Sequence, residues 1–222
     1  MPSFNINKFS ANLFKTGVLP NNKYEVLFGL PAGLAGTVVQ SDKGQSSFLL
    51  LNSDLSYRCI NATLPGVILR TSDVNRFGVG VLEKMPFSGS YTDVDFVFLC
   101  DRYGLAYNFW YGWLNYIFSV NGEVSPQNQT VRTNAGRSFY TTQYKDSYST
   151  DITIKVYDQT GNQAIQYQLV KAYPISISDT PVSWAATNDT VKLSIKVTFK
   201  EWYLLGKNDI PVTVQPPQAV GA

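Results

Sequence analysis

The clearest pattern in the chain is a strict alternation of apolar and polar residues over residues 190–200. Successive side chains of a strand point to opposite faces, so the two sets lie on opposite sides. The apolar side comprises Val191, Leu193, Ile195, Val197 and Phe199, and the polar side comprises Lys192, Ser194, Lys196, Thr198 and Lys200. The pattern predicts one half-buried β-strand. A shorter strand and a turn are expected just before it, within residues 173–189.

Further strands are expected in most of the remaining chain. Residues 23–28, 48–66, 79–87 and 91–101 are rich in strand-forming residues, with a loop around 70–78. Residues 151–175 read as a hairpin that turns at 158–162. We interpret the whole as a mainly β fold with antiparallel strands.

One segment has a helical period instead. Apolar residues recur three and four positions apart within residues 105–118, which predicts the one substantial helix; they are Ala106, Phe109, Trp110, Trp113, Leu114 and Ile117. The single expected domain, residues 1–222, also has less regular parts. These are an N-terminal arm (about 1–20, with a short helix or docking segment), inserted loops (about 29–47 and 123–149, with one weak strand near 138–144) and an extended tail (about 206–222).

Composition narrows the function. The chain has 222 residues, no histidine and a net charge of +2. Without imidazole, a Ser-His-Asp or Cys-His arrangement and a histidine metal site are excluded. The low net charge gives no case for tight polyanion binding. No signal peptide or apolar run of about 20 residues is present, so we expect folding in a cytosol with Cys59 and Cys100 as buried free thiols.

Candidate chemistry is sparse. Asp93, Asp95 and Asp101 are the only carboxylate cluster that suggests a metal or acid-base site, and a solvated strand face is the favoured interpretation. No phosphate-binding glycine loop is present. We therefore expect no enzyme activity, no catalytic or metal residues and no cofactor.

Candidate contact residues are easier to find. Tyr107 and Tyr111 lie four apart on a second face of the expected helix, where they can meet a neighbouring chain. Lys192, Lys196 and Lys200 form a stripe on the polar side of the strand at 190–200. They keep a sheet face soluble or pair with acids across an interface.

The order of these features resembles the T4-like tail tube family of contractile-tailed bacteriophages. The resemblance begins with residues 56–66, SYRCINATLPG, an aromatic-x-Cys strand followed by a Leu-Pro turn. It continues with residues 95–99, DFVFL, ahead of the aromatic helix with Trp113. The most specific part is C-terminal, and comprises AYPISIS at 172–178, Trp184, the pair Asn188-Asp189, the alternating strand and Trp202.

The resemblance implies an antiparallel β-sandwich or barrel-like tail tube fold with one flanking helix. It implies hexameric rings that stack into a DNA-delivery channel, with tail sheath and baseplate proteins as partners and DNA passing through without specific binding. Location in a virion tail follows, without a membrane anchor. A baseplate ring that initiates the tube is the alternative within the family. From another class, the aromatic residues allow a carbohydrate- or protein-binding module.

Overall fold

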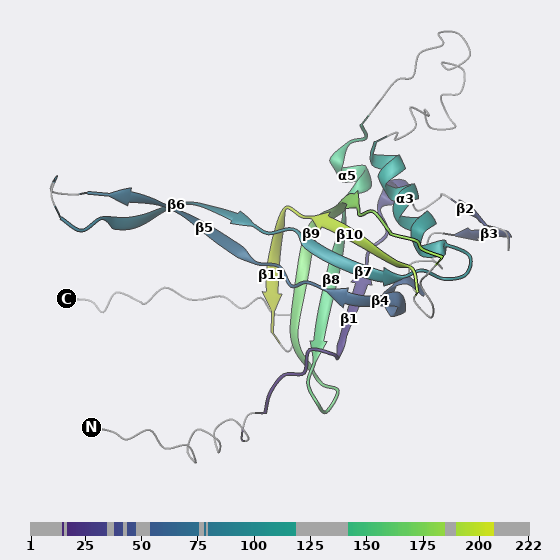
Figure 1. Ribbon diagram of the computed structural model, residues 1–222, viewed down its shortest axis with the longest axis horizontal. Helices are drawn as coiled ribbons and strands as arrows, with labels where there is room; N and C mark the ends of the chain where they lie inside the picture. Colours follow the sequence, from purple (N-terminus) through teal and green to yellow (C-terminus); the bar gives the residue numbers. More distant parts are fainter. Residues whose placement is uncertain are drawn as a thin grey trace, which may run out of the picture.

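The computed structural model describes residues 15, 17–34, 38–41, 44–47, 54–75, 78, 80–118, 142–184 and 190–206 (Figure 1). Its strands are β1 (Tyr24–Phe28), β2 (Val38–Ser41), β3 (Gly44–Ser47), β4 (Cys59–Ala62), β5 (Val67–Val74), β6 (Glu83–Tyr91), β7 (Val94–Leu99), β8 (Thr150–Tyr157), β9 (Gln163–Ile177), β10 (Lys192–Thr198) and β11 (Glu201–Leu205). Its helices include the 3-10 helix η1 (Ala32–Leu34), α3 (Leu105–Ile117) and α5 (Lys145–Tyr148), and residues 54–58 are also helical.

One seven-stranded sheet organises the fold. Its order is β1-β8-β9-β10-β7-β4, and β11 pairs with β9 beside that path. Every pairing in it is antiparallel. The hairpins β2–β3 and β5–β6 form two separate small sheets. The predicted mainly β, antiparallel fold is therefore confirmed.

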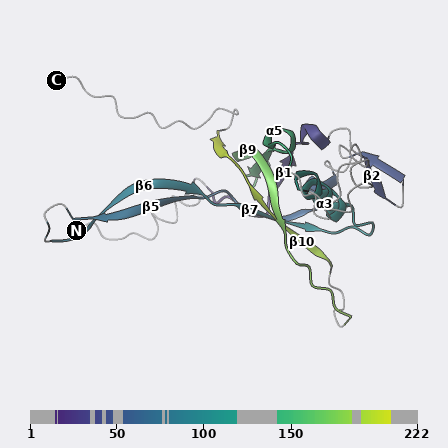
Figure 2. The same ribbon diagram turned by 90° about the horizontal axis from the view of Figure 1, so that it is seen from above.

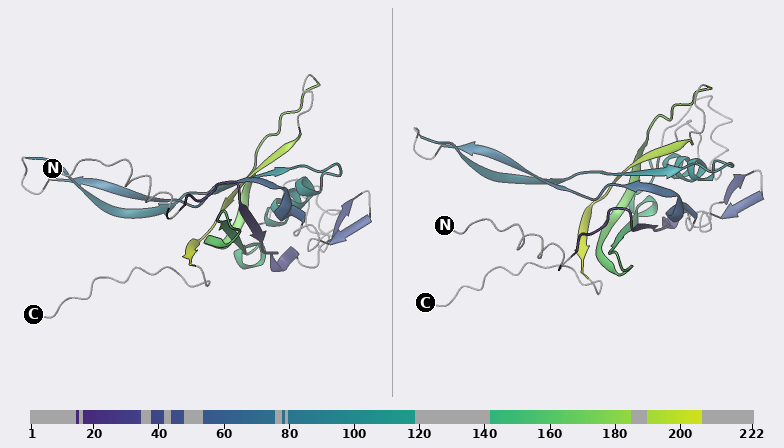
Figure 3. Two further views of the ribbon diagram at one scale, coloured as in Figure 1. Left: turned by 90° about the horizontal axis from the view of Figure 1, so that it is seen from below. Right: turned by 60° about the horizontal axis from the view of Figure 1, so that its bottom comes forward.

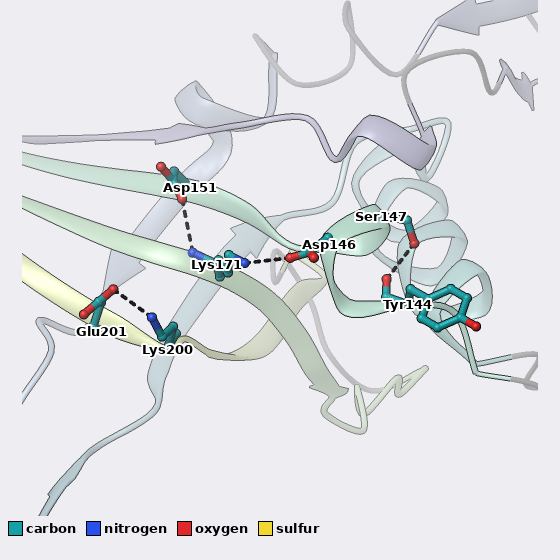
Figure 4. Close-up of polar contacts among 7 residues, drawn as sticks. All are labelled: Tyr144, Asp146, Ser147, Asp151, Lys171, Lys200 and Glu201. Carbon is teal, nitrogen blue, oxygen red and sulfur yellow. Dashed lines mark hydrogen bonds and ion pairs between the residues drawn. The ribbon is translucent and has the colours of Figure 1, made fainter.

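Strand β9 connects the two halves of this sheet. Its first part pairs with β8 and β11, and its last part, from Tyr173 onward, pairs with β10. Between them Lys171 has φ 51°, a left-handed conformation that is rare for a residue with a side chain. The Lys171 amide donates to an Asp151 carboxylate oxygen at 3.1 Å, and its Nζ lies 2.6 Å from Asp146 of α5 (Figure 4). These contacts fix the point at which β9 changes partners.

The sheet curls until its two outer strands meet. The Tyr24 hydroxyl on β1 donates to the carbonyl of Cys59 on β4 at 3.0 Å. These strands stand at opposite ends of the strand order, so this bond closes the sheet toward a barrel.

Helix α3 covers the apolar inside of the sheet. The helix contributes Phe109, Trp110 and Trp113, all fully buried. Trp110 stacks on Trp113 at 5.5 Å between ring centroids, and meets Phe28 of β1 and Phe98 of β7 at 5.5 and 5.3 Å. Strands β1, β7, β8, β9 and β10 supply fully buried residues: Val26, Val94, Phe96, Phe98, Ile152, Ile154, Leu169, Ala172, Leu193, Ile195 and Val197. The apolar residues of the alternating segment at 190–200 that belong to β10, Leu193, Ile195 and Val197, thus lie in the core.

Two local contacts hold α3. Its first turn is capped from outside, because the Asp101 carboxylate accepts the amides of Leu105 and Tyr103 at 2.7 and 3.3 Å. Toward its far end, Trp113 Nε1 donates to the carbonyl of Tyr148 at 2.9 Å, which ties α3 to α5. The predicted helix at 105–118 agrees with α3 to one residue.

Several predictions about the strands were wrong. Residues 54–58 are helical, so the aromatic-x-Cys segment is strand only from Cys59. Residues 70–74, expected in a loop, belong to β5. The shorter strand expected within residues 173–189 is the end of β9, which runs to Ile177, and β10 is shorter than residues 190–200. Strand β11 was not predicted.

The expected loops also differ where they are described. Within 29–47, η1 and the hairpin β2–β3 replace a plain loop. Within 123–149, the described part contains α5 and a bridge between Phe118 and Thr142, while the rest of the expected weak strand lies outside the described residues. The short N-terminal helix, the pair Asn188-Asp189 and all but residue 206 of the tail also lie outside them.

Candidate assembly surface

The hairpin β5–β6 projects from the body as an arm. Its strands pair from Val67 opposite Tyr91 to Val74 opposite Glu83, with one register shift between Arg70 and Thr71. Figures 1 and 2 show it leaving the sheet on the side away from α3. We call residues 67–91 the arm.

The arm continues a ribbon that starts inside the sheet. Beyond the last β4–β7 pair, Thr63 and Asp95 exchange two hydrogen bonds, Thr63 N to Asp95 O at 2.9 Å and Asp95 N to Thr63 Oγ1 at 2.7 Å. Gly66 and Thr92 do the same at 3.1 and 2.9 Å. A Cβ on Gly66 would lie 2.9 Å from Thr92 Oγ1, so a side chain fits poorly at this neck.

One aromatic contact ties the base of the arm to the body. The Tyr91 ring lies 5.9 Å from that of Phe199, which is buried at the end of β10. The hydrogen bond with Glu201 raises the pKa of Tyr203 on β11, and Tyr91 makes a smaller contribution in the same direction. The direction of the arm is thus set by its neck and by this contact.

The arm exposes several large apolar side chains, which a solvated hairpin should not do. Every residue of β5 and β6 is exposed or half-exposed. Its large exposed apolar side chains are Val67, Ile68, Leu69, Val81, Leu82, Phe87 and Tyr91. An isolated two-stranded hairpin is marginally stable in water, and exposed apolar patches mark contact sites. Both outer edges of the arm are also free for strand pairing among the described strands.

A cleft opens beside the place where β1 and β4 meet. It has a volume of about 700 Å³ and lies between these two strands, Ile154 and Val156 of β8, Ile165 of β9, and the segment before β1. Its lining residues are Leu19, Pro20, Asn21, Asn22, Tyr24, Cys59, Ile60, Asn61, Ala62, Leu64, Ile154, Val156 and Ile165. None of these residues is charged.

The cleft does not have the chemistry of a thiol site. Burial raises the pKa of Cys59 to about 12, so its thiol stays protonated at neutral pH and is a poor nucleophile. Burial first, and then the nearby Cys59, raises the pKa of Tyr24 to about 12, so Tyr24 remains a hydrogen-bond donor. Both cysteines are free.

The predicted contact residues on α3 lie together. The Tyr107 and Tyr111 rings stack with centroids 6.1 Å apart and planes 10° apart, and Tyr107 is about half exposed. The sequence spacing of four is the reason for this contact. Their role in an interface stays a prediction.

The predicted lysine stripe is divided. Lys192 and Lys196 lie on the outward face of β10, and Lys196 stands opposite Asp95 of β7 and Ser176 of β9. Lys200 lies beyond the end of β10, where its Nζ is 3.3 Å from Glu201 (Figure 4). Only Lys192 and Lys196 therefore lie on the same face of β10.

Of the three aspartates considered for chemistry, Asp93 is exposed between β6 and β7, and the other two have structural contacts. Asp101 caps α3, whereas Asp95 faces outward beside Lys196 and bonds through its backbone at the neck. Among the described residues, no group of three or more acidic, cysteine or histidine side chains could hold a metal ion. None of the described helices is long and apolar enough to span a bilayer.

A comparison with known protein families shows the family to which the chain belongs. The description of the matching family is phage tail tube protein, and the match covers residues 19–205. The chain belongs to the phage tail tube protein family. It is a structural protein of the tail tube type, and the matched region spans the whole sheet, α3 and the arm.

Several solved structures are similar to this chain at low sequence identity. The cap that terminates the tube of the anti-feeding prophage is 14% identical, with a TM-score of 0.51 over 86% of this chain and 92% of that chain. A chain of the PVC sheath-tube complex, an extracellular contractile injection system, is 15% identical (TM-score 0.46; 92% and 99% covered). Hcp1 from Salmonella typhimurium is 11% identical (TM-score 0.37; 83% and 87% covered). A search of curated proteins found no match.

The sequence prediction missed the arm of this tail tube protein. Residues around 70–78 were interpreted as a loop between two strand-rich segments. The available signal was the apolar run Val67-Ile68-Leu69, followed by the two glycines at 78 and 80 and by Val81 and Leu82. This pattern is typical of a hairpin, and here its apolar side chains are not buried within the subunit.

Proposed function

We propose that this protein is a T4-like tail tube subunit that forms hexameric rings, which stack into the DNA-delivery channel of a contractile phage tail. The arm is the observation that carries the proposal. It displays Leu69 and Phe87, each about two-thirds exposed, on two strands that pair with each other and with no other described strand. An exposed apolar surface does not stabilise a monomer, whereas in a repeating assembly a neighbouring copy covers it in every subunit.

The sheet suits the wall of a channel. Its outward face at β7 and β10 carries Asp95 beside Lys196, with Ser194 and Thr198 between and beyond the lysines. Charges of both signs and hydroxyl groups hold a polyanion weakly, since attraction by lysine is offset by the neighbouring carboxylate. A rigid pipe with such a lumen guides DNA by its shape. Tail sheath and baseplate proteins are the proposed partners, and no cofactor or catalytic step is involved.

Electron microscopy of purified protein tests the proposal. We expect rings, and at higher concentration stacked rings or tubes, with six subunits in projection averages. The matched variant is Leu69→Ser with Phe87→Ser, which removes apolar surface from the arm and leaves the core intact. It should remain folded by circular dichroism and lose rings or stacking. Monomers at every concentration for the unmodified protein would contradict the proposal.

A baseplate ring that initiates the tube is the alternative within the family. Such a ring subunit would have the same arm and sheet, but it would form a short ring assembly instead of a long tube. Single or double rings that do not elongate, even at high concentration, would support it. Long homopolymeric tubes would favour the repeated tube subunit.

A binding module is the alternative from another class. The stacked and partly exposed Tyr107–Tyr111 pair offers an aromatic platform to a sugar ring or a partner side chain. A glycan array with the unmodified protein and with Tyr107→Ser plus Tyr111→Ser tests it. Saturable binding that the double variant loses would support a module, and the absence of binding would remove this alternative.

A further inference from the structure

The cleft beside β1 and β4 is uncharged and has no occupant from the described chain, and its lining combines apolar side chains with Asn21, Asn22 and Asn61. Leu19, Ile60 and Leu64 at its rim are each about 40–50% exposed. Ile154 and Val156, buried on β8, form part of its floor. Covering such side chains is favourable at about 25 cal/mol per Å² of apolar surface removed from water.

The tip of the arm matches the cleft in chemistry. Val81 is 98% and Leu82 55% exposed, and both precede β6 directly. Gly78 and Gly80 accompany them with φ 73° and 135°, so the backbone turns without bulky side chains. The described tip residues 78 and 80–82 are uncharged up to Glu83, which begins β6, and the cleft lining is uncharged as well.

The tip cannot fill the cleft of its own chain. Leu64, at the rim of the cleft, lies just before the arm, whose strand β5 has 8 residues. At about 3.4 Å per residue, β5 carries the tip about 27 Å beyond its base. Figures 1 and 3 show the free end of the arm pointing away from the body from several directions. Folding back would break the β5–β6 ladder.

We propose that Val81 and Leu82 at the tip of one subunit enter the cleft of a neighbouring copy, between its Leu64 and Ile60 rim and its β8 floor. The proposal rests on the proposed function and names the surface that receives the arm. Tip and cleft are different patches of one chain, so the contact is head-to-tail. Such a contact repeats from copy to copy and produces a closed ring or an open stack, whereas a self-complementary patch stops at a dimer.

Cysteine cross-linking tests this pairing. In a Cys59→Ser, Cys100→Ser background, Leu82→Cys is combined with Leu64→Cys at the cleft rim. The matched control combines Leu82→Cys with Leu27→Cys, which replaces a similarly exposed leucine on the outward face of β1. After mild oxidation, a non-reducing gel should show a ladder of covalent multimers for the Leu64 pair. The Leu27 pair should give at most a trace, at least tenfold weaker.

The outcomes separate this inference from the proposed function. A ladder specific to the Leu64 pair supports the inference. Rings or tubes that form normally while the Leu64 pair cross-links no more than the Leu27 pair overturn it and leave the proposed function standing. An assembled Leu64→Cys variant whose thiol still reacts freely with a soluble maleimide also overturns it, because the cleft is then open or holds another occupant. The absence of any assembly by the unmodified protein overturns both.

Hydrogen exchange covers the case in which the cysteine variants do not assemble. The unmodified protein is compared as monomer and as assembly. Backbone amides near residues 81–82 and 60–64 should both exchange at least tenfold more slowly in the assembly. Unchanged exchange at either segment would overturn the pairing.

Discussion

Replacing Lys171 by glycine and, separately, by alanine measures the backbone conformation at which β9 changes partners. Lys171 has φ 51°, and its amide donates to Asp151 at 3.1 Å. Both replacements remove the Lys171–Asp146 contact, whose side chains are 46% and 82% exposed, so this loss cancels in the comparison. The difference between the two variants then reports on the left-handed backbone.

The expected difference follows from two opposing effects. A left-handed conformation costs a residue with a Cβ about 1–2 kcal/mol that glycine does not pay. Glycine loses more backbone entropy than alanine on folding, and this effect alone makes the alanine variant more stable by about 0.4–1 kcal/mol. We therefore expect the glycine variant to be the more stable by about 0.5–1 kcal/mol. For a chain of this size, that corresponds to about 1–4 °C in the midpoint of thermal unfolding.

Urea unfolding at a concentration at which the protein is monomeric measures this difference. The free energies of unfolding of the two variants are compared, with equal m-values as the check that both unfold from similar states. Asp151→Asn serves as a second probe, since it keeps the size of the side chain and weakens the acceptor for the Lys171 amide. An alanine variant as stable as the glycine variant, or more stable, would refute the left-handed assignment at position 171.

Two further predictions concern the core and the pH response. Trp113→Phe should lower the free energy of unfolding by about 2–4 kcal/mol, because it leaves a cavity and removes the partner of the buried Tyr148 carbonyl; Trp184→Phe, at a fully exposed tryptophan, should change it little in the same urea titration. Burial raises the pKa of Tyr24 to about 12, and the hydrogen bond to Glu25 does the same for Tyr157. Because the folded protein holds these protons more tightly than the unfolded chain, stability should be unaffected below about pH 10 and fall between pH 10 and 12. Tyr24→Phe with Tyr157→Phe should flatten that fall in unfolding experiments across this range, and an unchanged slope would contradict the role of both hydroxyls.

The sequence predicted best those elements whose one side enters the core. The strict alternation before Phe199 and the three-four spacing around Trp110 each mark a face that is buried within the subunit. Both β10 and α3 follow these patterns closely. A buried face leaves a periodic record in the sequence, so a single chain suffices to detect it.

Other elements were missed for identifiable reasons. Pro174 suggested a break, but it sits inside β9 opposite Val197, where the register shifts and the absence of an amide hydrogen is tolerated. Strand β11 begins only two residues after the core residue Phe199 and pairs with the distant β9. Tyr107 and Tyr111 were paired correctly because a local spacing decides their contact. The arm and the cleft depend on the path of the chain in space, which local patterns do not record.

The continuity of the neck also determines how the subunit carries mechanical load. Strand β7 runs from the arm into the sheet and is bonded along its length to β10, from Val94 opposite Val197 to Leu99 opposite Lys192. A pull along the arm acts parallel to β7, so it shears these bonds all together, whereas a sideways pull would open them one at a time. Tension reaching the tip is thus shared across the stiffest part of the molecule, with the aromatic layer of α3 directly behind it.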